Sequence, residues 1–79
     1  MTDKIPPQAL DIEDAVLGAM LIDSNCLNIA MSKLFSDVFY REANTLIFQA
    51  IENLYDKGQP VDILTVADQM RRDGSLEQC

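Results

Sequence analysis

The chain has little of several residue types on which enzyme and metal chemistry depends. It contains no histidine, two cysteines and three glycines. Zinc sites and activated serine nucleophiles usually need histidine or paired cysteines, and Cys26 and Cys79 are remote from each other in the sequence. The scattered glycines form no glycine-rich loop of the kind that wraps a nucleotide phosphate. We therefore expect no catalytic residue, no bound cofactor and no metal in this chain.

Long apolar runs and basic residues are also scarce. No apolar run approaches the ~18 residues that a membrane span needs, and the first residues lack the apolar core of a signal peptide, so we expect a cytoplasmic protein. Six basic residues against thirteen acidic ones give a net charge of -7. An acidic surface repels the phosphate backbone of nucleic acids, so direct DNA binding is disfavoured and a basic protein partner fits the charge better.

Apolar residues recur at helical spacing, which predicts an all-α fold: a compact bundle of about four helices within residues 9–79, preceded by an extended arm over residues 1–8. The expected helices cover approximately residues 12–22, 25–33, 42–57 and 62–73. Gly58 and Gly74 supply left-handed helix stops after the last two of them. Asp62 or Thr65 is expected to cap the fourth helix, and Ser24 or Asn25 the second.

The first helix carries several marks of its own. Asp11 is expected to cap it, with Asp14 three residues further on. Its apolar residues lie on two sides, which predicts a helix buried between neighbours, and Gly18 inside it predicts that another helix crosses closely there. The later segment that contains Phe35 and Phe39 is expected to form a turn or 3₁₀ piece that fills the core.

Few side chains suggest a binding role. The carboxylates Asp11, Glu13 and Asp14 could indicate acid–base chemistry, but beside a helix N-terminus they are better explained by capping and by the helix dipole. Phe48 and Tyr55 are a heptad apart on the flank of the third helix, where they either cover the edge of the core or form a subunit contact. The candidate partner contacts are Asp11, Asp14, Phe48 and Tyr55; for each one alone, the alternative is a solvated charge or a core-edge aromatic.

Two other functions are compatible with a small acidic helical chain. An acyl carrier protein needs an Asp-Ser-Leu motif at a helix start, and here Asp23-Ser24-Asn25 and Gly74-Ser75-Leu76 each lack one element. A helix-turn-helix reads bases with the N-terminal end of its second helix, where this chain has Asp62, Ile63 and Leu64. Both interpretations are therefore disfavoured.

Four blocks of the sequence resemble one family, in the same order and at the same spacing. They are Pro6-Pro7 with Ala15-Val16-Leu17-Gly18-Ala19, Phe39-Tyr40 with Ile47-Phe48-Gln49-Ala50-Ile51, Gly58-Gln59-Pro60-Val61-Asp62-Ile63-Leu64-Thr65-Val66-Ala67, and Asp73-Gly74-Ser75-Leu76. These blocks are similar to the N-terminal domain of DnaB-type replicative DNA helicases. One departure is Asn44, where the family often has histidine; asparagine keeps a hydrogen bond there but does not titrate near neutral pH.

The resemblance implies a function for a longer parent protein. The parent would be a ring-shaped hexamer that unwinds DNA at the replication fork by ATP hydrolysis, with ATP and magnesium held by a C-terminal motor domain that this chain lacks. The N-terminal domains would form a collar that helps to assemble the ring and receives primase. DNA would be bound through the motor. Leu76 looks like the beginning of a further segment, which fits a chain cut from a longer protein.

Overall fold

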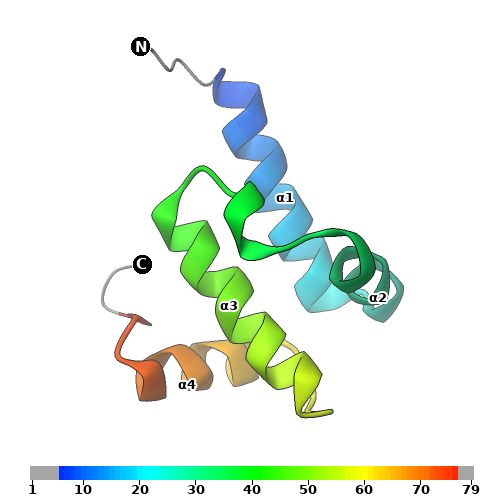
Figure 1. The fold of residues 1–79 in the computed structure, drawn as a ribbon, viewed down its shortest axis with the longest axis vertical. Coiled ribbons are helices and arrows are strands. Elements are labelled where there is room, and N and C mark those ends of the chain that lie inside the picture. Colours follow the sequence, from blue (N-terminus) through cyan, green and yellow to red (C-terminus); the bar gives the residue numbers. More distant parts are fainter. Residues whose placement is uncertain (1–5, 77–79) are drawn as a thin grey trace.

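The computed structural model describes residues 6–76, and within this range the chain forms four α-helices, one 3₁₀ helix and no strand. The elements, in chain order, are α1 (Pro7–Ile22), α2 (Ser24–Lys33), η1 (Ser36–Val38), α3 (Glu42–Asp56) and α4 (Ile63–Asp73). Figure 1 shows their arrangement. The predicted all-α bundle is confirmed.

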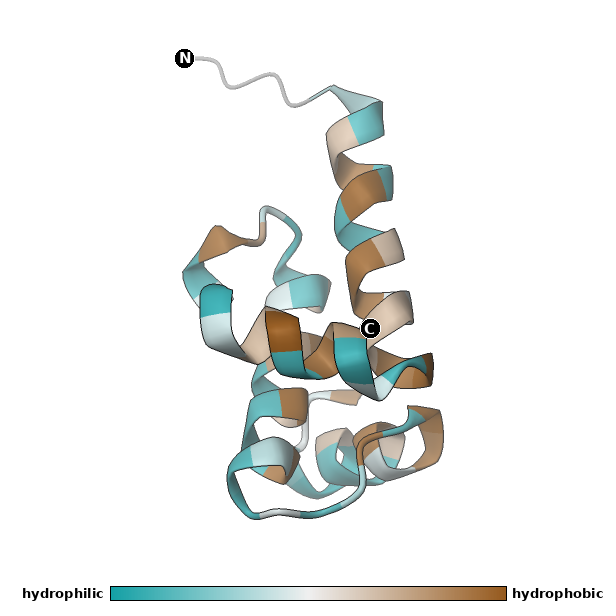
Figure 2. Ribbon diagram, turned by 90° about the vertical axis from the view of Figure 1, so that its right-hand side faces the viewer, coloured by the Kyte–Doolittle hydropathy of each residue, from teal (hydrophilic) through white to brown (hydrophobic). Residues whose placement is uncertain are grey.

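The helices are grouped in two pairs. α1 contacts mainly α2, α3 contacts mainly α4, and a smaller contact between α1 and α3 joins the pairs. α2 lies beside the C-terminal end of α1, while α4 lies across α3 (Figure 1). The first turns of α1 project beyond the other helices in both views (Figures 1 and 2). Hence the contact between α1 and α3 is the main direct link between the two helix pairs within residues 6–76.

All four helices contribute to one apolar core. Its buried members are Leu17, Met20, Leu27, Ala30, Phe48, Ala50, Ile51, Leu54, Val66 and Met70. Phe48 is 0% exposed, so of its two predicted roles the subunit contact is wrong, and the ring lies inside the core and not only at its edge. The reason is Phe39, whose ring centroid lies 5.1 Å from that of Phe48 and covers this side of the helix. Phe35, which was also expected in the core, is instead exposed.

The end of α3 and both ends of α4 form as predicted. The Asp62 carboxylate accepts hydrogen bonds from the backbone N–H groups of Leu64 and Thr65, each at 2.9 Å, and the Thr65 hydroxyl accepts from the Asp62 N–H at 2.9 Å. Gly58 and Gly74 adopt φ of 70° and 76°, which a residue with a Cβ reaches only with strain. Helix-end chemistry therefore fixes these boundaries locally.

The starts of the first two helices differ from the prediction. α1 begins at Pro7, five residues before the expected start, because the fixed φ of proline suits a first helical position. The end of the predicted arm is thus helical, and its residues 1–5 lie outside the described range. No side chain caps α1, so Asp11 is an internal helical residue. α2 is capped by Asp23, whose carboxylate accepts from the Asn25 N–H at 2.8 Å.

α1 is less enclosed than its apolar pattern predicts. Of its residues only Leu17 and Met20 are buried, while Ile12 is exposed and Ile22 is 87% exposed. A Cβ placed on Gly18 would meet no atom within 4 Å, so no helix crosses there. The expectations of a buried first helix and of a close crossing at Gly18 are both wrong for this chain. One face of α1 packs, and the others remain accessible.

The open space beside Gly18 gives a stability prediction. Gly18→Ala is expected to raise the free energy of unfolding by about 0.5–1 kcal/mol, because alanine loses less backbone entropy in a helix interior. Urea denaturation followed by circular dichroism measures the change. The matched control is Gly74→Ala, which should destabilise the chain because position 74 has a positive φ. A destabilised Gly18→Ala variant would mean that another surface packs against Gly18 in solution.

Candidate interaction surface

A polar cluster around the buried Asn44 side chain joins α1 to the first turn of α3. Asn44 on α3 is 5% exposed, and its side-chain amide donates to the Glu13 carboxylate at 2.9 Å and to the Asp14 carboxylate at 3.0 Å. Both acceptors belong to α1. A buried amide without partners costs free energy, so these two bonds favour the observed placement of α3 against α1.

Glu13 also caps α3 from outside that helix. Its carboxylate accepts from the Tyr40 N–H at 2.6 Å and from the Arg41 N–H at 3.4 Å. Arg41 is the N-cap residue of α3, and its own side chain makes no capping bond. The prediction that Glu13 serves the N-terminus of its own helix is wrong: α1 starts at Pro7, and Glu13 instead places negative charge at the positive end of the α3 dipole.

The surroundings of Glu13 change its acidity. Burial alone raises the pKa of Glu13, but hydrogen bonds from the Asn44 side chain and from the Tyr40 and Arg41 backbone, together with the Arg41 charge, outweigh it. The pKa of Glu13 therefore lies below its ordinary value of 4.5. Arg41 also pairs with Asp14 at 3.9 Å, but both side chains are about half exposed, so this ion pair contributes little.

The lowered pKa of Glu13 predicts how stability depends on pH. The carboxylate stabilises the fold above pH 4.5, and this contribution is lost as the pH falls through the lower folded-state pKa. Glu13→Gln is expected to lose about 1–2 kcal/mol of unfolding free energy at neutral pH and to show a shallower decline on acidification. Urea denaturation across acidic and neutral pH measures both effects. Glu52→Gln, on the side of α3, is the control, and its unfolding free energy should fall with pH as in the wild type. If the unfolding free energy fell equally with pH in all three proteins, the role of Glu13 would be contradicted.

The four predicted contact residues do not form one site. Asp11 is exposed, and Asp14 is exposed but engaged by Asn44. Tyr55 is partly exposed, and its hydroxyl donates to the Asn28 side chain at 3.0 Å, which links α3 to α2. Phe48 is enclosed in the core and offers no surface to a partner. Partner contact by Asp11, Asp14 and Tyr55 stays a prediction.

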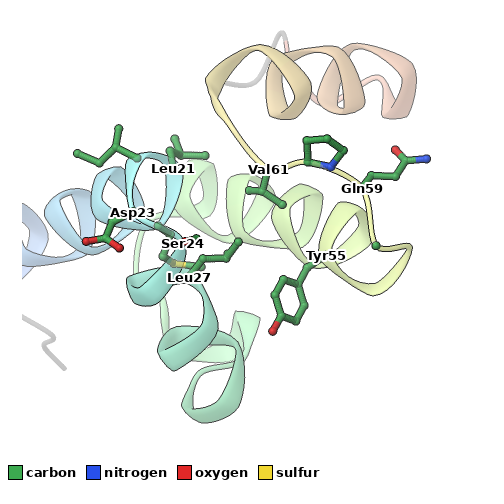
Figure 3. Close-up of a pocket in the computed structure, with 11 residues that line it drawn as sticks. Leu21, Asp23, Ser24, Leu27, Tyr55, Gln59 and Val61 are labelled. Carbon is green, nitrogen blue, oxygen red and sulfur yellow. The ribbon is translucent and has the colours of Figure 1, made fainter.

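Two hollows lie beside the contact between α1 and α2. One, of about 530 Å³, is bordered by Leu27 from α2, Tyr55 from α3 and Val61 from the connection before α4 (Figure 3). The other is an apolar groove of about 300 Å³ between α1 and α2. Its lining residues are Val16, Ala19, Met20, Cys26, Ile29, Ala30, Lys33 and Leu34. Such a groove is suited to apolar side chains of another protein.

Some exposed apolar residues were not singled out from the sequence. Ile22, Ile63 and Leu64 are among the most exposed large apolar side chains of the described residues. Ile63 and Leu64 open α4, and only the later turns of that helix supply buried residues, among them Val66 and Met70. The available signal was position: each of these three residues lies next to a helix end.

Neither a metal site nor a membrane-spanning helix occurs within residues 6–76. Across residues 6–76, no group of three or more histidine, cysteine, aspartate or glutamate side chains is arranged to hold a metal ion. Over that part of the chain, no helix has the length and apolar character needed to cross a bilayer. The features that remain for binding are the groove, the hollow and the exposed apolar residues.

Comparison with known proteins places the chain in a family. Residues 5–79 match the family described as DnaB-like helicase N terminal domain. The replicative DNA helicase DnaB of Rhodothermus marinus is 44% identical over 95% of the chain, and the replicative DNA helicase DnaC of Bacillus subtilis is 37% identical over 99%. The chain spans only 8% and 17% of the lengths of these two relatives.

A solved structure agrees with the sequence relatives. The crystal structure of the N-terminal domain of DnaB helicase from Mycobacterium tuberculosis superimposes with a TM-score of 0.86 and 38% identity, covering 94% of this chain and 53% of that one. Sequence and fold therefore lead to the same assignment: this chain belongs to the family of DnaB-like helicase N-terminal domains.

Proposed function

We propose that this chain is the N-terminal interaction module of a replicative DNA helicase, which helps to assemble the helicase ring and receives primase. The observation that carries the proposal is the agreement in fold, at a TM-score of 0.86 over 94% of the chain, with the N-terminal domain of a DnaB helicase. The chain itself is not an enzyme in this proposal. DNA unwinding, ATP hydrolysis and the magnesium ion belong to the motor of the longer cytoplasmic parent.

The surface of the chain supports a protein partner. Large apolar side chains are exposed on α1, α2 and α4, and the groove between α1 and α2 is almost wholly apolar. The net charge of -7 favours a partner with basic residues and disfavours direct contact with DNA phosphates. In this proposal DNA is bound by the motor of the parent.

Sedimentation velocity tests the module directly. The chain is run alone over a range of concentrations and then with primase from the same organism. We expect a faster-moving complex with primase, weakened at high salt because part of the attraction is electrostatic. Arg72→Ala, in an exposed ion pair on α4, is the variant expected to leave the complex unchanged. Independent migration of chain and primase at high concentration would contradict primase binding.

The alternative, that the chain is an acyl carrier protein, is tested by measuring the intact mass of the chain. The chain is incubated with a phosphopantetheinyl transferase and coenzyme A, and its intact mass is then measured. We expect no added phosphopantetheine, because Ser24 is the first residue of α2 but is followed by Asn25 and not by the leucine of the carrier motif. A phosphopantetheinylated product would overturn the proposed function.

A further inference from the structure

We propose that Glu13, Asp14 and Asn44 form a latch that fixes the orientation of the α1–α2 pair relative to the α3–α4 pair, and that these pairs move as two rigid bodies when the latch opens. We call these three residues the Asn44 latch. It is distinct from the partner-binding function proposed above, because it concerns motion within one chain.

The helices share their contacts unequally. α1 packs chiefly on α2, and α3 packs chiefly on α4, whereas α1 and α3 share a smaller contact. One apolar core runs through both pairs, but less contact joins the pairs than holds each pair together, so motion is expected at the contact between α1 and α3.

The Asn44 latch lies where the chain crosses from one helix pair to the other. The chain passes from one pair to the other through residues 34–41, in which Phe35, Val38 and Tyr40 are exposed. Glu13 holds the last two backbone N–H groups of this connection, those of Tyr40 and Arg41, as well as the Asn44 amide. The latch thus fastens both the connection and the start of α3 to α1.

Asn44 differs from the other buried amide side chain in the helices to which it bonds. Among the described residues two polar side chains are buried, Asn44 at 5% and Gln69 at 7% exposure. Gln69 donates to Asp73 at 2.9 Å, which lies on the same helix. Asn44 donates only across the junction, to two carboxylates of α1. The Gln69 amide therefore bonds within a single helix, whereas the Asn44 amide bonds between the two helix pairs.

A further link between the pairs is present but weaker. The Tyr55 hydroxyl and the Asn28 side chain form a single hydrogen bond between neutral, exposed groups. Such a bond contributes less than the charge-assisted bonds of the latch. Loss of the latch should therefore leave the pairs connected by the apolar core and by this bond, so that they reorient without separating.

Residual dipolar couplings of the ¹⁵N-labelled chain test the proposal. In the wild-type protein one alignment tensor should fit the backbone couplings of α1, α2, α3 and α4. In Asn44→Ala, separate tensors should be needed for the α1–α2 pair and for the α3–α4 pair. Gln69→Ala is the matched control, and one tensor should still suffice. One common tensor in folded Asn44→Ala would overturn the proposal.

Hydrogen exchange in the wild-type protein provides a test that needs no variant. The latch predicts that the Tyr40 and Arg41 amides exchange through a partial opening that leaves the amides in the middle of α3 protected. Protonation of Glu13 at acid pH should increase this opening; the other charged groups facing Asn44 are Asp14 and Arg41. Exchange of all these amides only through global unfolding, with the same dependence on urea, would overturn the proposal even if Asn44→Ala fails to fold.

Discussion

Phe48→Ala is expected to remove about 3–5 kcal/mol of unfolding free energy, the usual cost of deleting a fully buried aromatic side chain. Phe48 is 0% exposed and its ring packs against that of Phe39. A chain of 79 residues buries a small core, so this loss takes most of its stability. Urea denaturation followed by circular dichroism should show a strongly shifted or absent transition.

Two further variants show whether Phe48 acts in the core or as a contact with a partner. Phe48→Leu keeps most of the apolar volume and should retain a cooperative transition at a lower urea midpoint. Tyr55→Phe removes only the hydroxyl that bonds Asn28, so it should lose about 1 kcal/mol or less. If Phe48→Ala unfolded like the wild type and lost only its association with partners, the aromatic would be a subunit contact, which is the other role that its sequence position allowed.

The interpretation of Phe48 as a partner contact is wrong for a reason that applies to many helices. Helical periodicity identifies the centre of the buried face of α3, where Ala50, Ile51 and Leu54 lie. It does not say how wide that face is. The width is set by Phe39, which comes from the connection before the helix and covers one flank. No local pattern in the sequence reports this contact.

The parts of the fold that local chemistry controls were predictable. Asp62, Thr65 and Gly74 define α4 through bonds and dihedral angles within a few residues. The start of α1 was missed because two opposing effects act at Pro6-Pro7: the residue before a proline is extended, whereas proline itself favours a first helical turn. In the structure Pro6 is the extended residue and Pro7 opens the helix.

The polar cluster could be found from sequence only in part. The carboxylates of residues 11–14 and the asparagine at position 44 stood out as separate features, one as a helix cap and the other as a departure from a family pattern. The cluster forms through hydrogen bonds from Asn44 to Asp14 and to Glu13, which lie 30 and 31 positions before it in the chain. Sequence spacing holds no information about such pairs, because tertiary packing alone brings them together.

Asn44→Asp is the second change with a large expected effect. It replaces the amide that donates to Glu13 and Asp14 with a carboxylate, so that three carboxylates meet and both donated bonds are lost. A buried charge without compensation costs several kcal/mol, and we expect a loss of about 3 kcal/mol of unfolding free energy at neutral pH. Asn53→Asp, at an exposed position of the same helix, is the control and should change stability by about 0.5 kcal/mol or less.

The dependence of this loss on pH identifies its cause. The two carboxylates of α1 should raise the pKa of the new carboxyl at position 44 in the folded state, so its destabilising effect is complete above that raised pKa and is relieved as the pH falls through it. The wild type behaves oppositely in acid, because the lowered pKa of Glu13 makes the fold lose stabilisation on protonation. The difference in unfolding free energy between the two proteins should therefore hold above the raised pKa and narrow as the pH falls through it into the acid range, as measured by urea titrations. A difference that stayed constant would mean that position 44 does not face Glu13 and Asp14 in solution, and the junction between the helix pairs would need another explanation.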